Sequence, residues 1–393
     1  MLAQIDQSAS RRVLLITASV GAGHNQATKA ILELLRQRSP QLGVDVIDSM
    51  DLVPRFFRAY YAGGFAIAVS KFPRSYGVGF WISDRPQRPG RCLNERVRLW
   101  TERRMLTRLG GHLQANRYDL IVNMHFLTPP YITRLARRGW ELPPQWVVIT
   151  DIEVHRFWYS EGVERWFAPS EYSAAKLHRW GIPDGRVTVS GIPVHPKWAA
   201  PLDRSKILQE WRLPADKKIV LLAGGAEFTC GPVAKMARDI VEACPEAYVV
   251  VLGGRNKKLL ADLASMPESP GRLVGVAFTD RVHELVEVCS IMVTKAGGIT
   301  TAECLAKGTP MILMRPVPGQ ERGNAQYLAS QGAAVVTRDF KSVTAELLRL
   351  LKDPEALAAL AGNARRLDKP ATVTIVSEIL RRVEMSSAAS SRP

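Results

Sequence analysis

Short runs of apolar residues alternate along most of the chain with longer segments in which apolar residues recur every three or four positions. The short runs occupy residues 13–19, 44–47, 120–122, 146–150, 165–168 and 187–189, and then 219–222, 248–252, 273–274, 290–293, 311–314 and 334–336. Apolar strands separated by helical patterns are typical of buried parallel sheets with helices on both faces. The pattern therefore predicts an α/β protein with two doubly wound, Rossmann-like domains.

Prolines mark the boundary between the two predicted domains. Pro193, Pro196 and Pro201 interrupt any regular element between residues 191 and 201. We therefore expect a first domain over residues 11–196 and a second over residues 202–370. A final helical pattern covers residues 371–385. In sheets of this kind ligands bind at the carboxyl ends of the strands, so the functional residues are expected there.

Composition narrows the class of protein. The 393 residues are 46% apolar and 23% charged, which excludes a disordered chain or a coiled coil. The longest uncharged apolar-rich stretch, residues 59–70, has 12 residues, whereas a membrane-spanning helix needs about 20. No secretory signal is visible, so we expect a cytoplasmic protein. The five cysteines and the histidines lack the spacing of metal ligands, which favours reduced thiols over disulfides or zinc.

Basic residues exceed acidic ones by 16, and more than half of that excess lies in one segment. Residues 55–108 hold twelve Lys and Arg against three Asp and Glu, interleaved with aromatic residues such as Phe56, Phe57 and Trp81. Apolar side chains framed by basic ones are typical of a surface that enters the headgroup region of an anionic membrane. We therefore expect a membrane-docking insertion over residues 53–112. The alternatives are a helical insertion with core aromatics and a solvated basic face, or nucleic-acid binding, for which no recognisable module is present.

A glycine-containing turn, Gly21-Ala-Gly23-His24, links the first predicted strand to a helix. A dinucleotide-binding turn has a third glycine where this chain has Gln26, so the motif is a weak indication of NAD. Alternatively, the turn brings backbone amides close to a ligand and directs His24 into the site. A helix N-terminus disfavours the histidine cation, which leaves His24 neutral and able to act as a general base. A capping or solvated histidine is the structural alternative.

The richest polar motif follows the predicted strand at residues 290–293. Residues 295–301, Lys-Ala-Gly-Gly-Ile-Thr-Thr, open a helix that carries Glu303 in its early turns. Backbone amides at such a helix N-terminus bind anions such as a diphosphate, and Glu303 could accept both hydroxyls of a ribose. Residues 316–324 follow as a proline-containing loop with amide and carboxylate side chains that suit sugar hydroxyls. The motif predicts a site for a nucleotide diphosphate sugar, with a simple capped helix junction as the alternative.

Three motifs resemble the family of monogalactosyldiacylglycerol synthases and processive diacylglycerol glucosyltransferases, and the likeness covers nearly the whole chain. They are Gly21-x-Gly23-His24; Val148-Ile-Thr150-Asp151 with His155 and Trp158; and Lys295-x-Gly-Gly-Ile-Thr300 with Glu303, Pro318-Gly-Gln-Glu321 and Asn324. Ala296 stands where glucosyltransferase members often have proline. This difference leaves the preference for one donor sugar open, but it does not affect the prediction of the phosphate site. The resemblance implies the GT-B fold, in which two Rossmann-like domains face each other across a cleft and the final helix crosses back onto the first domain.

The resemblance implies inverting transfer of a hexose, glucose or galactose, from a UDP-hexose to diacylglycerol at the inner face of the cell membrane. His24 is the expected general base, and Asp151 is the second candidate or a ligand of the acceptor hydroxyl. The expected donor-binding residues are Gly23, Gly225, Lys295, Gly297, Gly298, Ile299, Thr300, Glu303, Gly319, Gln320, Glu321 and Asn324. The expected acceptor and lipid residues are His125, His155, Trp158, Phe56, Phe57 and Trp81. His125 and His155 are alternatively satisfied buried histidines.

The expected partners are a UDP-sugar, diacylglycerol and anionic membrane lipids. No metal or other cofactor is expected, because the chain has no Asp-x-Asp motif to hold a divalent ion on the diphosphate. Two other UDP-sugar enzymes share the implied fold. An undecaprenyl-linked N-acetylglucosaminyltransferase shares the first glycine motif, and a UDP-N-acetylglucosamine 2-epimerase would act without lipid. The sequence leaves open the hexose, the number of sugars added and the oligomeric state.

Overall fold

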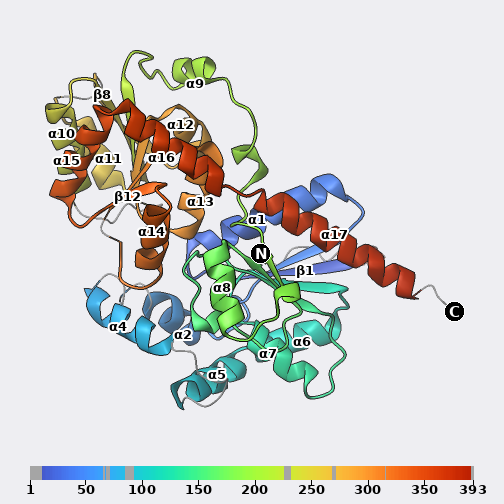
Figure 1. Ribbon diagram of the computed structural model, residues 1–393. Coiled ribbons are helices and arrows are strands. Elements are labelled where there is room, and N and C mark those ends of the chain that lie inside the picture. Colours follow the sequence, from blue (N-terminus) through green and yellow to red (C-terminus); the bar gives the residue numbers. More distant parts are fainter. Residues whose placement is uncertain are drawn as a thin grey trace. The chain divides into compact units, whose positions relative to one another are not determined.

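The computed structural model describes residues 11–64, 67, 71–84, 93–224, 232–267, 271–314 and 316–390. Gly225, an expected donor residue, lies outside the described residues. The chain divides into two compact units, each with its own sheet (Figure 1). The first unit contains residues 1–196, 317–320 and 369–393, and the second contains residues 197–316 and 321–368.

The first unit is built on a six-stranded parallel sheet with the order β2-β1-β3-β4-β5-β6. Its strands are β1 (Arg12–Thr17), β2 (Gly43–Asp48), β3 (Leu120–Asn123), β4 (Gln145–Val148), β5 (Arg165–Ala168) and β6 (Val187–Val189). Helices α1 (Ala22–Arg38), α7 (Pro129–Ala136) and α8 (Glu171–Arg179) cover it, with the short 3-10 helices η2 (Arg156–Trp158) and η3 (Asp184–Arg186). Strand order reverses between β1 and β3, and ligands of such sheets bind at the carboxyl ends of the strands at this point, so the ligand crevice is predicted there.

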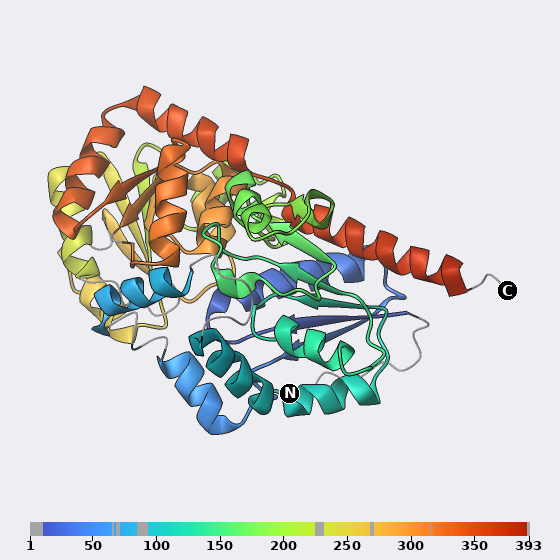
Figure 2. The same ribbon diagram turned by 60° about the horizontal axis from the view of Figure 1, so that its bottom comes forward.

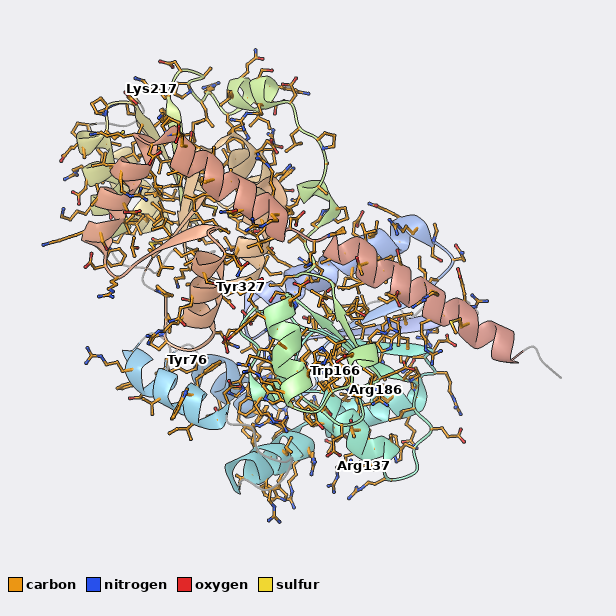
Figure 3. All side chains as sticks on the ribbon, viewed as in Figure 1. Tyr76, Arg137, Trp166, Arg186, Lys217 and Tyr327 are labelled. Atoms are coloured by element: carbon orange, nitrogen blue, oxygen red, sulfur yellow. The ribbon has the colours of Figure 1, made fainter. Side chains whose placement is uncertain are left out.

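The core of this unit forms because the strands carry uninterrupted apolar residues. Leu14, Ile16 and Ile121 pack with apolar residues of the helices on one side, and Val147 and Trp166 pack with α8. Trp166, labelled in Figure 3, is only 2% exposed.

The last helix, α17 (Ala371–Ser390), belongs to the first unit although it follows the second in sequence. It packs on α1 and lies beside that helix in both Figure 1 and Figure 2. Glu378 of α17 forms an ion pair with Arg165 of β5 at 2.7 Å. The Oγ1 of Thr372 donates a hydrogen bond to the Val194 carbonyl at 2.6 Å. The helix therefore completes the first unit, and it extends beyond the predicted end at residue 385.

A helical insertion separates β2 from β3. It comprises α2 (Arg55–Arg58), the π-helix η1 (Ala59–Gly63), α4 (Pro73–Ser83), α5 (Leu93–Met105) and α6 (Thr107–Ala115). Phe56 and Trp81 are 68% and 66% exposed, as expected of a docking surface. Phe57, by contrast, is only 4% exposed and packs in the core, so its assignment to the lipid surface was wrong. Within the described ranges, every helix falls short of the length and apolar character needed to cross a membrane.

The second unit has a six-stranded parallel sheet with the order β12-β11-β10-β7-β8-β9. Its strands are β7 (Lys218–Ala223), β8 (Ala247–Gly254), β9 (Leu273–Ala277), β10 (Ile291–Thr294), β11 (Met311–Met314) and β12 (Ala334–Thr337). Its helices are η4 (Pro196–Trp198), α9 (Arg204–Glu210), α10 (Val233–Ala243), α11 (Lys257–Ala264), α12 (Val282–Val288), α13 (Gly298–Lys307), α14 (Gln320–Ser330), α15 (Phe340–Leu351) and α16 (Pro354–Leu367). Two parallel doubly wound sheets confirm the predicted fold class.

Candidate active site

His24 lies where the carboxyl ends of three neighbouring strands meet. It stands in the first turn of α1, shortly after β1. Its Nδ1 is 2.9 Å from the Oγ1 of Thr150, which follows β4. Its imidazole also forms a hydrogen bond with the backbone carbonyl of Met124, the residue after β3. Because β1, β3 and β4 are adjacent in the sheet, the topology holds this imidazole at the predicted crevice.

Asn25 stabilises the turn that carries His24. The Oγ1 of Thr17 donates to Asn25 Oδ1 at 2.7 Å, and Asn25 Nδ2 donates to the Oγ of Ser19 at 2.8 Å. The side chain therefore ties the end of β1 to the start of α1. Asn25 was not among the predicted site residues, although its position directly after His24 was an available signal.

Both histidines at the crevice are neutral at neutral pH. Burial lowers the pKa of His24 to about 4, and the Met124 carbonyl offsets part of that effect. The His125 ring stands edge-on to His24, with 4.7 Å between the ring centroids. Its Nδ1 accepts a hydrogen bond from the Leu127 N–H at 3.1 Å, so the neutral ring carries its proton on Nε2. Burial, with the nearby His24, lowers the pKa of His125 well below its usual value. A neutral His24 was predicted from the helix N-terminus, but burial is the main cause of its lowered pKa.

Asp151 and Trp158 lie on the segment that follows β4. Asp151 is half-buried and directly follows Thr150, the partner of His24. Trp158 is only 1% exposed, and its ring centroid lies 6.2 Å from that of His24 and 6.2 Å from that of His125. The indole Nε1 of Trp158 is buried and has no hydrogen-bond partner among the residues that the structure describes. The structure thus brings the expected catalytic residue His24 together with His125 and Trp158.

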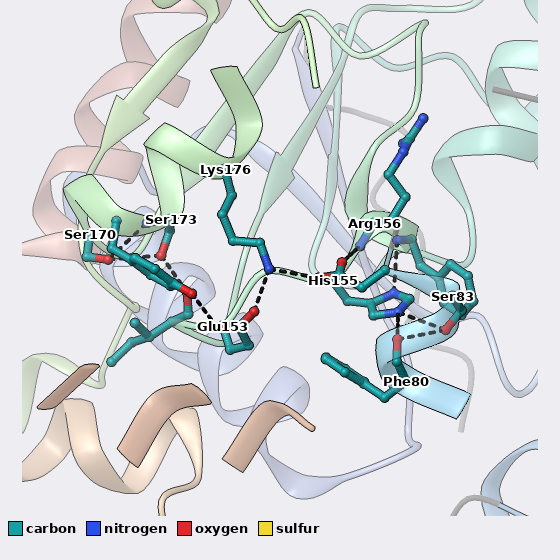
Figure 4. Close-up of polar contacts among 12 residues, drawn as sticks. Phe80, Ser83, Glu153, His155, Arg156, Ser170, Ser173 and Lys176 are labelled. Atoms are coloured by element: carbon teal, nitrogen blue, oxygen red, sulfur yellow. Dashed lines mark hydrogen bonds and ion pairs between the residues drawn. The ribbon is translucent and has the colours of Figure 1, made fainter. Parts of the chain in front are cut away.

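His155 uses both ring nitrogens within the protein, as Figure 4 shows. Its Nδ1 accepts a hydrogen bond from the Phe157 N–H at 3.1 Å. Its Nε2 lies 3.2 Å from the Phe80 carbonyl oxygen and 3.1 Å from the Oγ of Ser83, both on α4. Burial lowers its pKa to about 3. These contacts favour the alternative of a satisfied buried histidine, one that ties α4 to η2.

A buried ion cluster fixes the carboxyl end of α4 to the same region. The Nζ of Lys176 on α8 contacts Asp84 Oδ2 at 2.9 Å and also pairs with Glu153 (Figure 4). Asp84 Oδ1 accepts a hydrogen bond from the Arg156 N–H at 2.7 Å, and Tyr172 donates to Glu153 at 2.7 Å. The insertion is therefore anchored to the segment that holds Asp151 and Trp158.

In the second unit, the start of α13 is open to an anion. Gly297 precedes the helix with an extended backbone (φ −74°, ψ 141°), and no side chain caps the first amides. A Cβ at Gly297 would meet nothing within 4 Å, so a ligand has room to approach the backbone there. The Thr301 hydroxyl instead donates to the Gly297 and Gly298 carbonyls at 2.9 and 3.0 Å. Within the described part of the chain no side chain caps the amides of the first turn, so they remain for a ligand such as a diphosphate.

Other predicted donor residues surround this helix end. Lys295 and Thr300 are half-buried, whereas Gly298 and Ile299 are buried. Glu303 is half-buried, and it has no hydrogen bond or ion pair with any residue that the structure describes. Burial raises the pKa of Glu303 to about 8, against the opposing charge of Lys197. Its carboxyl group is therefore available to ligand hydroxyls, and the ribose role stays a prediction.

The residues around the start of α14 have mixed roles. Asn324 is fully buried, and its Nδ2 donates to the Ala296 carbonyl at 2.9 Å, so this amide supports the loop before α13. Gly319 has a positive φ of 106°, Gln320 is the first residue of α14, and Glu321 lies in its first turn. Their contact with a donor sugar remains a prediction.

The described residues offer no group of three His, Cys, Asp or Glu side chains that could hold a metal ion. Cys244, Cys289 and Cys304 are buried free thiols, and Cys92 and Cys230 lie outside the described residues.

Comparisons with known proteins divide the chain near the boundary between the two compact units. The monogalactosyldiacylglycerol (MGDG) synthase family model matches residues 24–194, and the glycosyltransferase family 28 C-terminal domain model matches residues 219–373. The chain is 30% identical over 369 residues to a processive diacylglycerol beta-glucosyltransferase of Bacillus cereus (strain ZK / E33L), covering 91% of this chain and 90% of that protein. It is 29% identical over 388 residues to the Bacillus pumilus (strain SAFR-032) protein of the same name, covering 96% of each.

A solved structure with the same fold is UDP-GlcNAc 2-epimerase from Neisseria meningitidis bound to UDP-GlcNAc. It matches with a TM-score of 0.60 at 16% identity, covering 94% of this chain and 100% of that one. The GT-B fold expected from the motifs is confirmed. At this identity the likeness shows the fold alone.

Proposed function

The chain belongs to the family of monogalactosyldiacylglycerol synthases and processive diacylglycerol glucosyltransferases, and we propose that it transfers glucose from UDP-glucose to diacylglycerol. It is a UDP-sugar-dependent glycosyltransferase with a family 28 C-terminal domain. Glucose is proposed over galactose because both relatives described above carry the name glucosyltransferase.

The observation that carries the proposal is a neutral His24 at the joint ends of β1, β3 and β4. As an acceptor hydroxyl attacks the anomeric carbon, its proton passes to the imidazole, while the bond from that carbon to UDP breaks and UDP takes the electron pair. The Met124 carbonyl and Thr150 hold the ring in one orientation, which a positioned base requires. Attack from the face opposite UDP inverts the anomeric centre.

The second unit supplies charge stabilisation for the leaving UDP. The open amides at the start of α13 provide preorganised donors for a diphosphate, and Lys295 follows β10 directly. Glu303 provides a carboxyl group for the ribose hydroxyls. On this proposal a divalent ion is not required, so glycolipid synthesis is expected to persist in excess EDTA.

Exposed apolar side chains indicate where the enzyme meets its lipid acceptor. Among the described residues, nine of the thirteen exposed large apolar side chains lie between Phe56 and Trp100. Basic residues of the same insertion, such as Arg55 and Arg104, frame them. The exposed apolar side chains and the basic residues around them together support peripheral docking on anionic membranes. We place the enzyme at the inner face of the cell membrane.

The direct test is to incubate the purified protein with diacylglycerol vesicles and separate UDP-sugars, and to identify the products by mass. The expected product is glucosyldiacylglycerol from UDP-glucose. Transfer from UDP-galactose instead would overturn the choice of hexose. Conversion of UDP-N-acetylglucosamine without lipid would favour the epimerase, which shares the fold.

A further inference from the structure

Residues 317–320, a loop that ends at the first residue of α14, pack on helix α4. They belong to the first unit, although the chain on either side of them belongs to the second. All four residues are half-buried. The Oη of Tyr76 on α4, labelled in Figure 3, donates a hydrogen bond to Gln320 Oε1 at 3.3 Å. The 317–320 loop is therefore held by the unit that carries His24.

The 317–320 loop and α4 approach each other closely because a glycine stands on each side. A Cβ at Gly77 of α4 would lie 2.4 Å from the Cβ of Pro318. A Cβ at Gly319 would lie 3.0 Å from the Cε1 of Tyr76 and 3.2 Å from the Cγ of Phe80. Carbon atoms that are not bonded prefer a separation of about 3.5–4.0 Å, so a side chain at Gly77 would push the loop away. The contact is thus close-packed and depends on both glycines.

The far end of α4 is fixed to the segment that follows β4. The Phe80 carbonyl oxygen and the Ser83 hydroxyl lie 3.2 and 3.1 Å from the Nε2 of His155 (Figure 4). Asp84, the residue after the helix, pairs with Lys176 at 2.9 Å. A closely packed helix transmits a displacement to the elements that it contacts. The place of α4 therefore sets the place of the 317–320 loop.

The hydrogen bond from Tyr76 also orients the side-chain amide of Gln320. The Oε1 atom of this amide accepts from the tyrosine, and its Nε2 makes no hydrogen bond with any residue that the structure describes. The Nε2 carries two N–H donors, and a sugar hydroxyl can accept from them. An amide that is oriented before the ligand arrives loses less conformational entropy on binding. The free donors suit the sugar-binding role predicted for Gln320.

We propose that Tyr76 and Gly77 are positioning residues for the donor hexose, because they hold the 317–320 loop so that the Gln320 amide meets a hydroxyl of the sugar. This role rests on the proposed transfer of a hexose from a UDP-hexose. Both residues act through the loop and not by contact with the sugar. Changes at these positions are therefore expected to weaken recognition of the hexose and to leave recognition of the UDP moiety unchanged.

Calorimetric titration of the full chain with UDP-glucose and with UDP, without lipid, separates the two parts of the donor. Gly77→Ala forces the loop away from α4, because the added Cβ overlaps Pro318. Gly79→Ala is the matched control, since it makes the same change in the same helix where an added Cβ meets nothing within 4 Å. Tyr76→Phe removes only the hydroxyl. Alanine favours a helix over glycine, so thermal melting should show both alanine variants folded.

We expect Gly77→Ala to raise the Kd for UDP-glucose about five- to tenfold and Tyr76→Phe to raise it several-fold, as the loss of a hydrogen bond does. The Kd for UDP should stay the same in both variants, and Gly79→Ala should change neither Kd. Tyr76→Phe keeps the packing of the loop, so it decides the matter even where Gly77→Ala melts early.

Two results would overturn the positioning role. One is an unchanged Kd for UDP-glucose in both Gly77→Ala and Tyr76→Phe. The other is an equal loss of affinity for UDP and UDP-glucose, which would indicate general damage to the donor site. Either result, with UDP-glucose bound by the wild type, would leave the proposed transferase function intact. A wild-type protein that did not bind UDP-glucose would instead contradict the proposed donor, and the positioning role with it.

Discussion

At the scale of single residues, burial rather than exposed charge sets the chemistry of both sites. His24 is kept neutral and Glu303 is kept partly protonated, because a charged form is poorly solvated at each position. Each group is placed at a strand or helix end where a ligand can supply the missing partner. Their pKa values are shifted in opposite directions, so the two groups change protonation state in different pH ranges.

Replacing His24 by Ala should lower kcat at least about 100-fold with donor saturating, because a general base contributes that much. Activity that depends on neutral His24 should be level above about pH 5 and fall as pH approaches its pKa of about 4. Steady-state rates over this pH range check both points. His178→Ala on α8 is the control and should keep full activity. A His24→Ala enzyme with more than a tenth of wild-type kcat would contradict the base assignment.

Glu303 should make donor binding pH-dependent, because its carboxylate form accepts ribose hydroxyls. With a pKa of about 8, the carboxylate fraction rises as pH rises from 7 to 9, so the KM for UDP-glucose should fall about tenfold. Glu303→Gln mimics the protonated form, and we expect it to keep a high, pH-independent KM. An identical pH dependence in wild type and Glu303→Gln would remove Glu303 from the donor site.

At the scale of elements, the ends of two helices have opposite functions. The start of α13 is left without a cap, which suits ligand binding, whereas the end of α4 is held by buried charges. Changes at the start of α13 are therefore expected to alter substrate affinity. Changes at the end of α4 are expected to alter the stability of the first unit.

Gly297→Ala should leave the fold intact, because its φ of −74° suits any residue and a Cβ there meets nothing within 4 Å. The added methyl group would occupy space at the proposed diphosphate site. We expect a several-fold higher Kd for UDP with little change in Tm, measured by calorimetry and thermal melting. Gly362→Ala, also in open space but inside α16, should leave UDP affinity unchanged and raise Tm slightly, because Ala favours the helix. Unchanged UDP affinity in Gly297→Ala would argue against this placement of the diphosphate.

Lys176→Met should destabilise the first unit by about 3–5 kcal/mol, because it leaves Asp84 and Glu153 without their shared cation. Both carboxylates are largely buried, so water replaces that cation poorly. Urea unfolding measures the loss, and Lys29→Met at an exposed position of α1 is the control. A loss below about 1 kcal/mol would mean that the cluster adds little to stability.

At the scale of the whole molecule, the sequence predicted the sheets well because buried parallel strands need uninterrupted apolar runs. All twelve predicted runs are strands of the two sheets. His24 was found for a similar reason, since the end of a strand and the start of a helix fix its place. Phe56 and Phe57 show the limit, because adjacent aromatics in a short helix face solvent and core respectively.

Other features depended on tertiary contacts that no local pattern carries. The two nitrogens of His155 are satisfied partly by α4, more than 70 residues away in the chain. A pocket of the first unit gathers Arg98 and Arg103 of α5, Arg134 of α7 and residues after η2, which look like solvated faces when each element is considered alone. Asn324 was taken for a sugar ligand, but the structure uses its amide to hold the loop before α13.

The proposed passage of hexose from UDP to diacylglycerol has a stoichiometry that can be measured directly. Radiolabelled UDP-glucose is supplied to the purified enzyme with diacylglycerol vesicles, and UDP release and label in the lipid phase are measured in the same samples. We expect one hexose in lipid for each UDP released, and no UDP release without diacylglycerol. UDP release that continues without the lipid, or label that stays in the aqueous phase, would contradict it.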